Sequence, residues 1–159
     1  MKLKRPVPSL IAHHRIWARL HMFILDTNVI SSQMAGKRDF VVLEWLNKYD
    51  PGDLFLTSIT IAEIYFGAYI VPDAARKEAL IQSLSRLIAA YQSRILSFSL
   101  SNSENYGRLT ATRRLAGRPI ETKDAMIAAI CIANNATLVT RNIRDFDGLD
   151  LKLINPFEA

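Results

Sequence analysis

The chain has 159 residues, half of them hydrophobic, which is the size and composition of one domain with a buried core. Its net charge of +5 comes from residues 1–21, which contain five basic residues and no acidic residue, because the rest of the chain has equal numbers of both. The basic charge is therefore weak support for nucleic-acid binding by the folded part, and the single cysteine, Cys131, excludes a disulfide or a cysteine zinc cage within one chain.

Residues 1–21 are predicted to be a basic extension outside the fold. Pro6 and Pro8 lie close together there, and Met22 stands directly before the first strand-like run. The segment lacks the apolar block of about 7 to 15 residues that a secretory signal carries. An organelle presequence or a nucleic-acid arm is the alternative interpretation of its basic residues.

Histidines and long apolar stretches are both missing from the rest of the chain. All three histidines, His13, His14 and His21, lie in the extension, so residues 22–159 contain no imidazole for general base catalysis or metal binding. No stretch approaches the ~18 consecutive apolar residues of a membrane span. Because a lone cysteine also suits a reducing compartment, we expect a cytoplasmic protein that does not enter a membrane.

Five short apolar runs, with helical patterns between them, predict an α/β fold. The runs cover residues 23–25, 54–57, 94–98, 137–139 and 151–154. Strands that alternate with helices favour a mostly parallel sheet covered on both faces. We find no repeat, linker or low-complexity tract, so residues 22–159 are predicted to form one domain.

Helix starts are marked by local signals. An amphipathic pattern of Leu80, Leu84 and Leu87, introduced by Asp73, predicts one helix. Two sequences have the form of a capping box: Thr60-x-x-Glu63 and Ser101-x-x-Glu104. The helix that the second box starts is expected to end near residue 117, where a glycine is followed two residues later by proline.

Three acidic residues occupy positions that a parallel sheet would bring together. Asp26 follows the first apolar run, Glu63 enters a helix after the second, and Asp124 opens an apolar helix over residues 125–133. Ligands of such sheets bind outside the carboxyl ends of the strands, where these positions converge. Carboxylates that crowd together repel unless a cation neutralises them, and Mg²⁺ or Mn²⁺ suits an all-oxygen site.

Each of these carboxylates also has an ordinary structural explanation. Asp26 fits a turn, Glu63 fits a capping box, and Asp124 fits the first turn of a helix, where the helix dipole favours negative charge. The joint placement of the three favours the metal site. A metal-activated water needs neither histidine nor serine, so the chemistry predicted from these residues is phosphodiester hydrolysis.

A fourth ligand is expected from the segment after the run at residues 137–139. Asp145 is placed near the metal and Asn142 is assigned as a polar positioner, while the alternative is that Asp145 only caps a turn. Basic residues precede Asp124 and flank Asn142, and they are candidate phosphate contacts. For Arg108 and Arg113 a solvated helix face is the favoured interpretation, whereas Arg141 is favoured as a contact. The full basic set is Arg108, Arg113, Arg114, Arg118, Lys123, Arg141 and Arg144.

The motifs together resemble the PIN domain nucleases, and most closely the VapC and FitB-like toxins of prokaryotic toxin–antitoxin modules. The matching stretches are residues 23–31, 56–63, 124–129 and 138–146, with Asn155-Pro156-Phe157 as a closing segment. Four such motifs in order are a strong signal, and the resemblance spans residues 22–159.

The resemblance implies a three-layer α/β/α PIN-like fold with about five strands and Mg²⁺- or Mn²⁺-dependent cleavage of RNA. By motif position, Asp26, Glu63 and Asp124 are the acidic cluster. Many members carry an acid directly after Thr-Arg, where this chain has Asn142, so Asp145 is taken as the fourth catalytic and metal-binding residue. Positioning roles are assigned to Thr27, Asn28, Thr140, Arg141 and Asn142.

The family also implies partners: an RNA substrate, a small antitoxin, a second copy in a homodimer, and DNA only indirectly through the antitoxin. One alternative is an antitoxin-bound partner in a DNA-binding regulatory complex with little nuclease activity. Another is an aspartyl phosphatase or phosphoacceptor domain, which Asn28 opposes because phosphatases of that type need a second aspartate at this position. Three or four ligands are compatible with either one or two bound metal ions.

Overall fold

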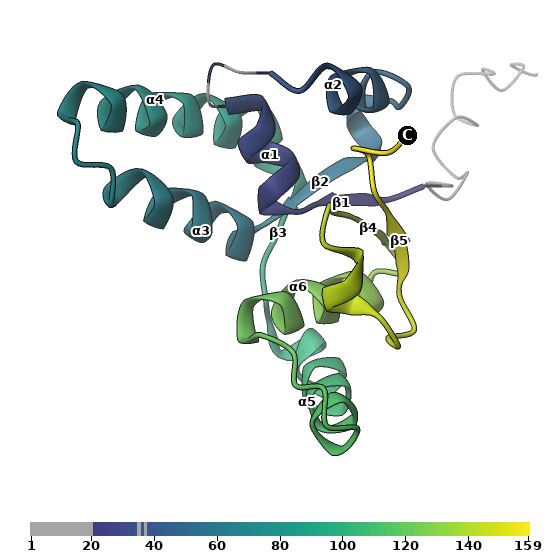
Figure 1. Ribbon diagram of the computed structural model, residues 1–159. Helices are drawn as coiled ribbons and strands as arrows, with labels where there is room; N and C mark the ends of the chain where they lie inside the picture. The colour runs from purple at the N-terminus through teal and green to yellow at the C-terminus, as the bar shows by residue number, and fades with distance from the viewer. Residues whose placement is uncertain (1–20, 35, 37) are drawn as a thin grey trace, which may run out of the picture.

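The computed structural model describes residues 21–34, 36 and 38–159 (Figure 1). Within them the strands are β1 Phe23–Leu25, β2 Leu54–Thr57, β3 Ile95–Leu96, β4 Thr137–Val139 and β5 Lys152–Ile154. Each neighbouring pair is parallel, in the order β3-β2-β1-β4-β5. The predicted parallel sheet of about five strands is confirmed.

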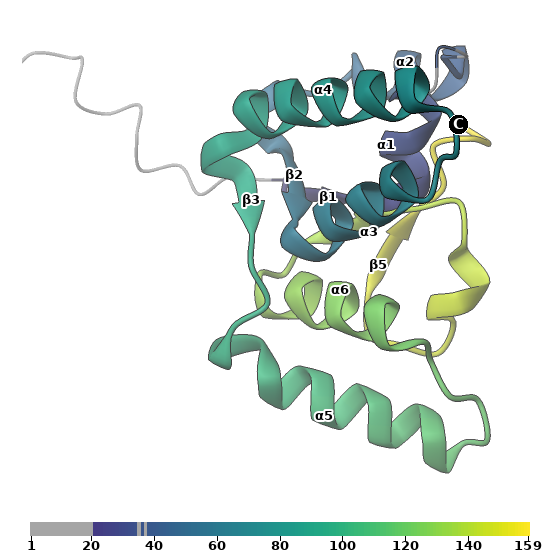
Figure 2. The same cartoon turned by 90° about the vertical axis from the view of Figure 1, so that its left-hand side faces the viewer.

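Helices cover both faces of this sheet, which confirms the predicted three layers. On one side lie α1 Thr27–Met34, α2 Phe40–Leu46, α3 Ser58–Tyr69 and α4 Ala74–Tyr91, and on the other lie α5 Leu100–Leu115 and α6 Thr122–Ala133 (Figures 1 and 2). Within the described residues, none of these helices is long and apolar enough to cross a membrane.

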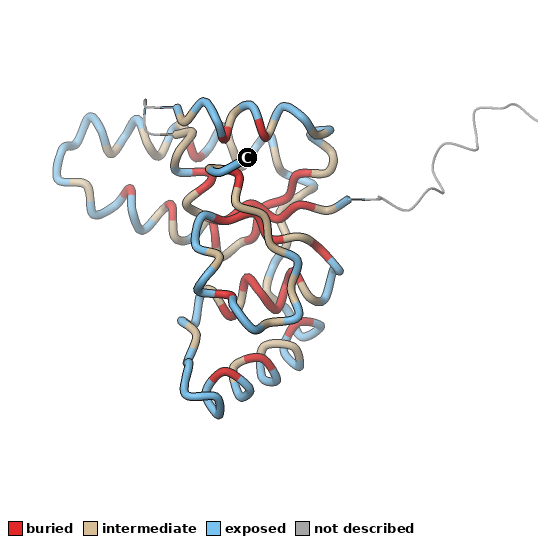
Figure 3. Tube along the Cα trace, turned by 45° about the vertical axis from the view of Figure 1, so that its right-hand side comes forward, coloured by how far each residue is buried: buried red, intermediate tan, exposed pale blue. Residues whose placement is uncertain are grey.

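The core is divided between the two faces by the alternation of strand side chains. Ile24 and Leu138 pack with α6, whereas Phe23, Leu25 and Val139 pack with the helices of the opposite face. The central strands are buried on both sides, as Figure 3 shows. Burial on both faces is typical of parallel sheets and explains why these strands read as continuous apolar runs.

The predicted strand over residues 94–98 is longer than the observed β3. Its partner β2 ends at Thr57, which pairs with Leu96, so the chain beyond Leu96 has no strand to pair with. At the other end, Arg94 belongs to a short 3-10 helix, Gln92–Arg94, and its guanidinium donates to the carbonyl oxygen of Leu54 at 2.7 Å.

Helix starts confirm one prediction and correct two. Asp73 caps α4 as expected, since its Oδ1 accepts from the backbone N–H of Arg76 at 2.6 Å. The capping box of α5 was placed two residues too late: Ser99 is its N-cap, and the Oδ1 of buried Asn102 accepts from the Ser99 N–H at 2.8 Å.

The second correction concerns α3. Thr57 ends β2 and is also the N-cap of α3, its hydroxyl accepting from the Thr60 N–H at 3.0 Å. The capping-box interpretation of Thr60 and Glu63, the structural alternative to a functional role for Glu63, is therefore wrong, because Thr57 is the N-cap and Glu63 lies one turn further into the helix. The Glu63 carboxylate therefore does not cap the helix. The end of α5 is as predicted, with Gly117 at a positive φ of 70° just after the helix.

The predicted extension falls almost entirely on residues 1–20, outside the described residues. Of its residues, only His21 is described, and its side chain is exposed. The assignment of residues 1–21 as an extension stays a prediction.

Candidate active site

The predicted acidic residues gather at the point where the sheet reverses its order. The chain adds β2 and β3 on one side of β1, then returns to add β4 and β5 on the other. Asp26 directly follows β1 and Thr140 directly follows β4, and these strands pair through Leu25 and Val139. A crevice at the carboxyl ends of two such strands is the expected ligand site of an open α/β sheet.

Asp26 is the most deeply placed of the carboxylates, with 5% of its surface exposed. Its Oδ1 accepts from the Thr27 N–H at 2.7 Å, and its Oδ2 accepts from Asn28 Nδ2 at 2.8 Å and from the Thr140 hydroxyl at 2.7 Å. Burial raises the pKa of Asp26 above its ordinary value, although these hydrogen bonds oppose the shift. The side chain is thus held rigidly in one orientation.

Glu63 reaches the same crevice from α3. The Thr27 hydroxyl donates to its Oε2 at 2.5 Å, and the Lys123 ammonium donates to its Oε1 at 3.0 Å. Thr27 therefore links two carboxylates, because its N–H binds Asp26 while its hydroxyl binds Glu63.

Asp124 lies half-buried in the first turn of α6. Burial raises the pKa of Asp124 to about 6, and the negative charges of Asp26, Glu121, Asp145 and Glu63 add to the shift. The four other carboxylates consequently all act on Asp124. Glu121 was missed by the sequence analysis, although its place three residues before Asp124, at the N-cap of α6, was a signal that could have included it.

The segment after β4 closes the site on its other side. The Thr140 hydroxyl accepts from the Asn142 N–H at 3.0 Å, and Asn28 Oδ1 accepts from the Arg141 N–H at 3.0 Å. Asn142 therefore contacts the site through its backbone N–H. Asp145 lies on a 3-10 helix, Ile143–Phe146. The side chain of Phe146 is buried and anchors this helix to the core.

Arg113 was expected on a solvated helix face, and that interpretation is wrong. Its guanidinium is buried and donates to the backbone oxygen of Arg118 at 2.7 Å and to that of Asp147. The side chain thereby ties α5 to the chain just after Asp145. The same interpretation holds for Arg108, which is exposed and pairs with Glu104 one turn away.

The donors of this crevice fit a divalent cation in chemistry. They are all oxygens, and their mutual repulsion is what a cation would relieve. Across residues 21–34, 36 and 38–159, no three acidic, histidine or cysteine side chains are grouped closely enough to hold one metal ion together. Magnesium needs only one or two carboxylates and fills its other positions with water and substrate, so the set fits a cation of that kind.

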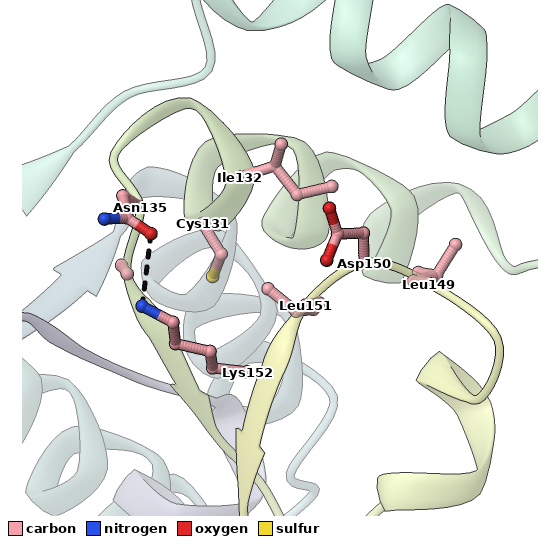
Figure 4. Close-up of a pocket in the computed structure, with 8 residues that line it drawn as sticks. Cys131, Ile132, Asn135, Leu149, Asp150, Leu151 and Lys152 are labelled. Carbon is pink, nitrogen blue, oxygen red and sulfur yellow. Dashed lines mark hydrogen bonds between the residues drawn. The ribbon is translucent and has the colours of Figure 1, made fainter.

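A second hollow, of about 300 Å³, lies away from this crevice (Figure 4). It is lined by Asn135 and Lys152 near the starts of β4 and β5, and the Lys152 ammonium donates to Asn135 Oδ1 at 3.2 Å. Because the acidic crevice is at the opposite ends of the same strands, this hollow has no part in its chemistry.

The raised pKa of Asp124 predicts a pH-dependent stability of the metal-free protein. The folded state holds the Asp124 proton more tightly than the unfolded state, whose pKa is near 3.8, so this stabilisation is complete below about pH 4 and is lost as the pH rises through about 6. We expect Asp124→Asn to remove the decline and to gain up to about 1 kcal/mol at pH 7.5, a figure reduced from the full shift because the group is half-exposed. Urea unfolding in the presence of a chelator, from pH 4 to 8, measures the effect. Parallel curves for parent and variant would contradict it.

The fold and the site together define a class of protein: a parallel α/β protein with acidic side chains gathered at the switch point of its sheet. Residues 23–151 match the family model described as the PIN domain, and the chain belongs to this family.

Relatives and solved structures agree with this assignment. The chain is 38% identical to plasmid stability protein StbB of Pseudomonas syringae pv. tomato, over 87% of this chain and 100% of that protein. It is 34% identical to a VapC ribonuclease of Sinorhizobium fredii, over 86% and 99% of the two chains. The crystal structure of FitAcB from Neisseria gonorrhoeae contains a chain that superposes with a TM-score of 0.81, at 28% identity, over 87% of this chain and 100% of that one.

Proposed function

We propose that this chain is a divalent-cation-dependent endoribonuclease and the toxin of a toxin–antitoxin module. The observation that carries the proposal is the convergence on Asp26: the hydroxyl of Thr140, 114 residues away in sequence, donates to its carboxylate at the switch point of the sheet. Relatives that carry the name VapC ribonuclease support RNA as the substrate.

Mg²⁺ or Mn²⁺ would bind among Asp26, Glu63, Asp124 and Asp145, through one or two of these carboxylates at a time, with water and substrate in its other coordination positions. The chemistry that such a cation supplies when bound is activation of water and neutralisation of charge on the phosphoryl oxygens. Thr27, Asn28 and Thr140 serve this site by orienting carboxylates, since their donors are directed to Asp26 and Glu63. Removal of a hydrogen-bonding partner of a metal ligand typically lowers metal affinity or activity by about 10- to 100-fold.

Arg141 is proposed to bind a phosphate of the RNA. Its guanidinium carbon lies 3.8 Å from the centre of the Phe157 ring, which preorganises a long and otherwise flexible side chain. A hollow of about 580 Å³ beside it is lined by Arg141, Asn142, Arg144 and Asp145, among others. Two guanidinium groups next to the acidic crevice suit the phosphodiester backbone that leads away from the cleaved bond.

The phosphoacceptor alternative is not supported. Phosphatases of that type need a second aspartate two positions after the first, and this chain has Asn28 there, whose Nδ2 donates to Asp26 Oδ2 at 2.8 Å.

Partners of the chain are proposed from its relatives and from its surface. A small antitoxin is proposed because the resemblance implies one, and because the structure of VapBC2 from Rickettsia felis, which contains a chain 31% identical to this one, is bound to a DNA fragment from their promoter. Self-association into a homodimer is supported by Phe66, Tyr69 and Ile70, which expose 67%, 60% and 63% of their surface at the end of α3. We place the protein in the cytoplasm, and DNA reaches it only through the antitoxin.

The test is RNA cleavage by the purified chain, free of antitoxin, with Mg²⁺, with Mn²⁺ or with a chelator. We expect internal cleavage that requires the cation, and sequencing of the RNA ends would identify the target. Cleavage that persists in the chelator overturns the metal-dependent proposal. No cleavage with either cation favours the regulatory alternative, in which the chain acts mainly as an antitoxin-bound partner.

A further inference from the structure

Among the described residues of the acidic crevice, Lys123 is the one lysine whose ammonium group pairs directly with an acidic side chain. Its Nζ lies 3.0 Å from Glu63 Oε1, while the Thr27 hydroxyl occupies Glu63 Oε2 at 2.5 Å. Both oxygens of Glu63 are therefore engaged by donors of the chain itself.

The position of Lys123 is unfavourable for the helix that carries it. It lies in the first turn of α6, between the N-cap Glu121 and Asp124. The positive end of the helix dipole disfavours a cation there, so helix stability gives no reason for a lysine at this position. Its partner is instead Glu63, 60 residues away on α3, in the part of the chain that also carries the predicted catalytic acids.

The ion pair is weak enough to exchange. Lys123 exposes 52% of its side chain and Glu63 exposes 21%, so water screens their attraction. A divalent cation carries twice the charge of the ammonium and competes for the same carboxylate.

We propose that Lys123 is a built-in counter-ion of Glu63 that competes with the divalent cation and so weakens cation binding. The inference rests on the proposed metal-dependent function. It also accounts for the grouping of the acids: with Glu63 held by Lys123 and Thr27, no three acidic side chains among the described residues share one cation position.

The test is a Mn²⁺ titration of the full chain without RNA, in which electron paramagnetic resonance counts the free ion. Lys123→Met should tighten Mn²⁺ binding about fivefold, since an exposed pair contributes up to about 1 kcal/mol. Lys123→Arg keeps the charge and should stay within about twofold of the parent. Lys152→Met is the matched control, because Lys152 also donates to a single side-chain oxygen but lines the remote hollow of Figure 4.

A double variant separates a local effect from a general change of charge. In a Glu63→Gln background, Lys123→Met should gain less than about twofold, because the competition acts through that carboxylate. An equal gain with and without Glu63, or an equal gain from Lys152→Met, overturns the inference.

Failure of this inference is distinguishable from failure of the proposed function. If the parent binds Mn²⁺ and cleaves RNA while Lys123→Met leaves the affinity unchanged, the inference alone is overturned. If the parent binds no Mn²⁺ at all, the metal-dependent function is overturned together with it.

Discussion

Asp26→Asn is expected to lower RNA cleavage by at least about 100-fold while the protein remains folded. Loss of a hydrogen-bonding partner of a metal ligand already costs about 10- to 100-fold, and Asp26 is proposed as a ligand itself. The free energy of unfolding should fall by only about 1 kcal/mol. The NH₂ that replaces Oδ2 cannot accept the hydrogen bond from Asn28, but the variant no longer buries a charge at this position. Initial cleavage rates and urea unfolding measure the two effects.

Asp150→Asn is the matched control for this substitution. Asp150 is exposed and lines the hollow at the opposite edge of the sheet, so the same chemical change there should leave cleavage within about twofold. Equal cleavage by Asp26→Asn and the parent would point to a contaminating nuclease and remove the support for the proposed site.

Ile127→Ala is expected to destabilise the fold by about 2 to 5 kcal/mol, the cost of emptying a buried site that cannot collapse fully. Ile127 has no exposed surface and lies on α6, where it belongs to the core cluster that contains Ile24 and Leu138. The substitution lies three residues after Asp124, so it also loosens the element that carries this carboxylate. The shift of the urea midpoint measures the loss.

Leu115→Ala provides the comparison for that core substitution. Leu115 lies at the end of α5 with 89% of its surface exposed, and truncation there should change stability by less than about 0.5 kcal/mol. A similar loss for both variants would contradict the assignment of Ile127 to the core.

The convergence of the acids was predictable from the order of elements alone. Asp26 follows a strand and Asp124 opens a helix, and the rule for parallel sheets places such positions at one edge without knowledge of any side-chain contact. Strand positions were equally legible, because strands buried on both faces appear as apolar runs.

Contacts between distant helices were not predictable in this way. The pair of Lys123 and Glu63 depends on how α6 packs beside α3, and no local pattern links residues 60 positions apart. Arg113 reads as a surface residue of an amphipathic helix, yet its acceptors are carbonyl oxygens that only the turn after α5 and the segment after Asp145 bring within reach.

The prediction of where α5 starts was wrong for a different reason. Ser99 and Ser101 are both good N-cap residues, and the form Ser-x-x-Glu favoured the second. The outcome was decided by Asn102, whose amide oxygen performs the role expected of a glutamate and whose side chain is buried.

The joining of β1 to β4 has a consequence for the time at which the protein becomes active. Asp26 is translated 114 residues before Thr140, whose hydroxyl donates to its carboxylate. A nascent chain without β4 lacks one of the two strands that pair with β1, and it lacks the Thr140 hydroxyl that orients Asp26. The site is therefore complete only once β4 and the segment after it have been translated and have joined β1.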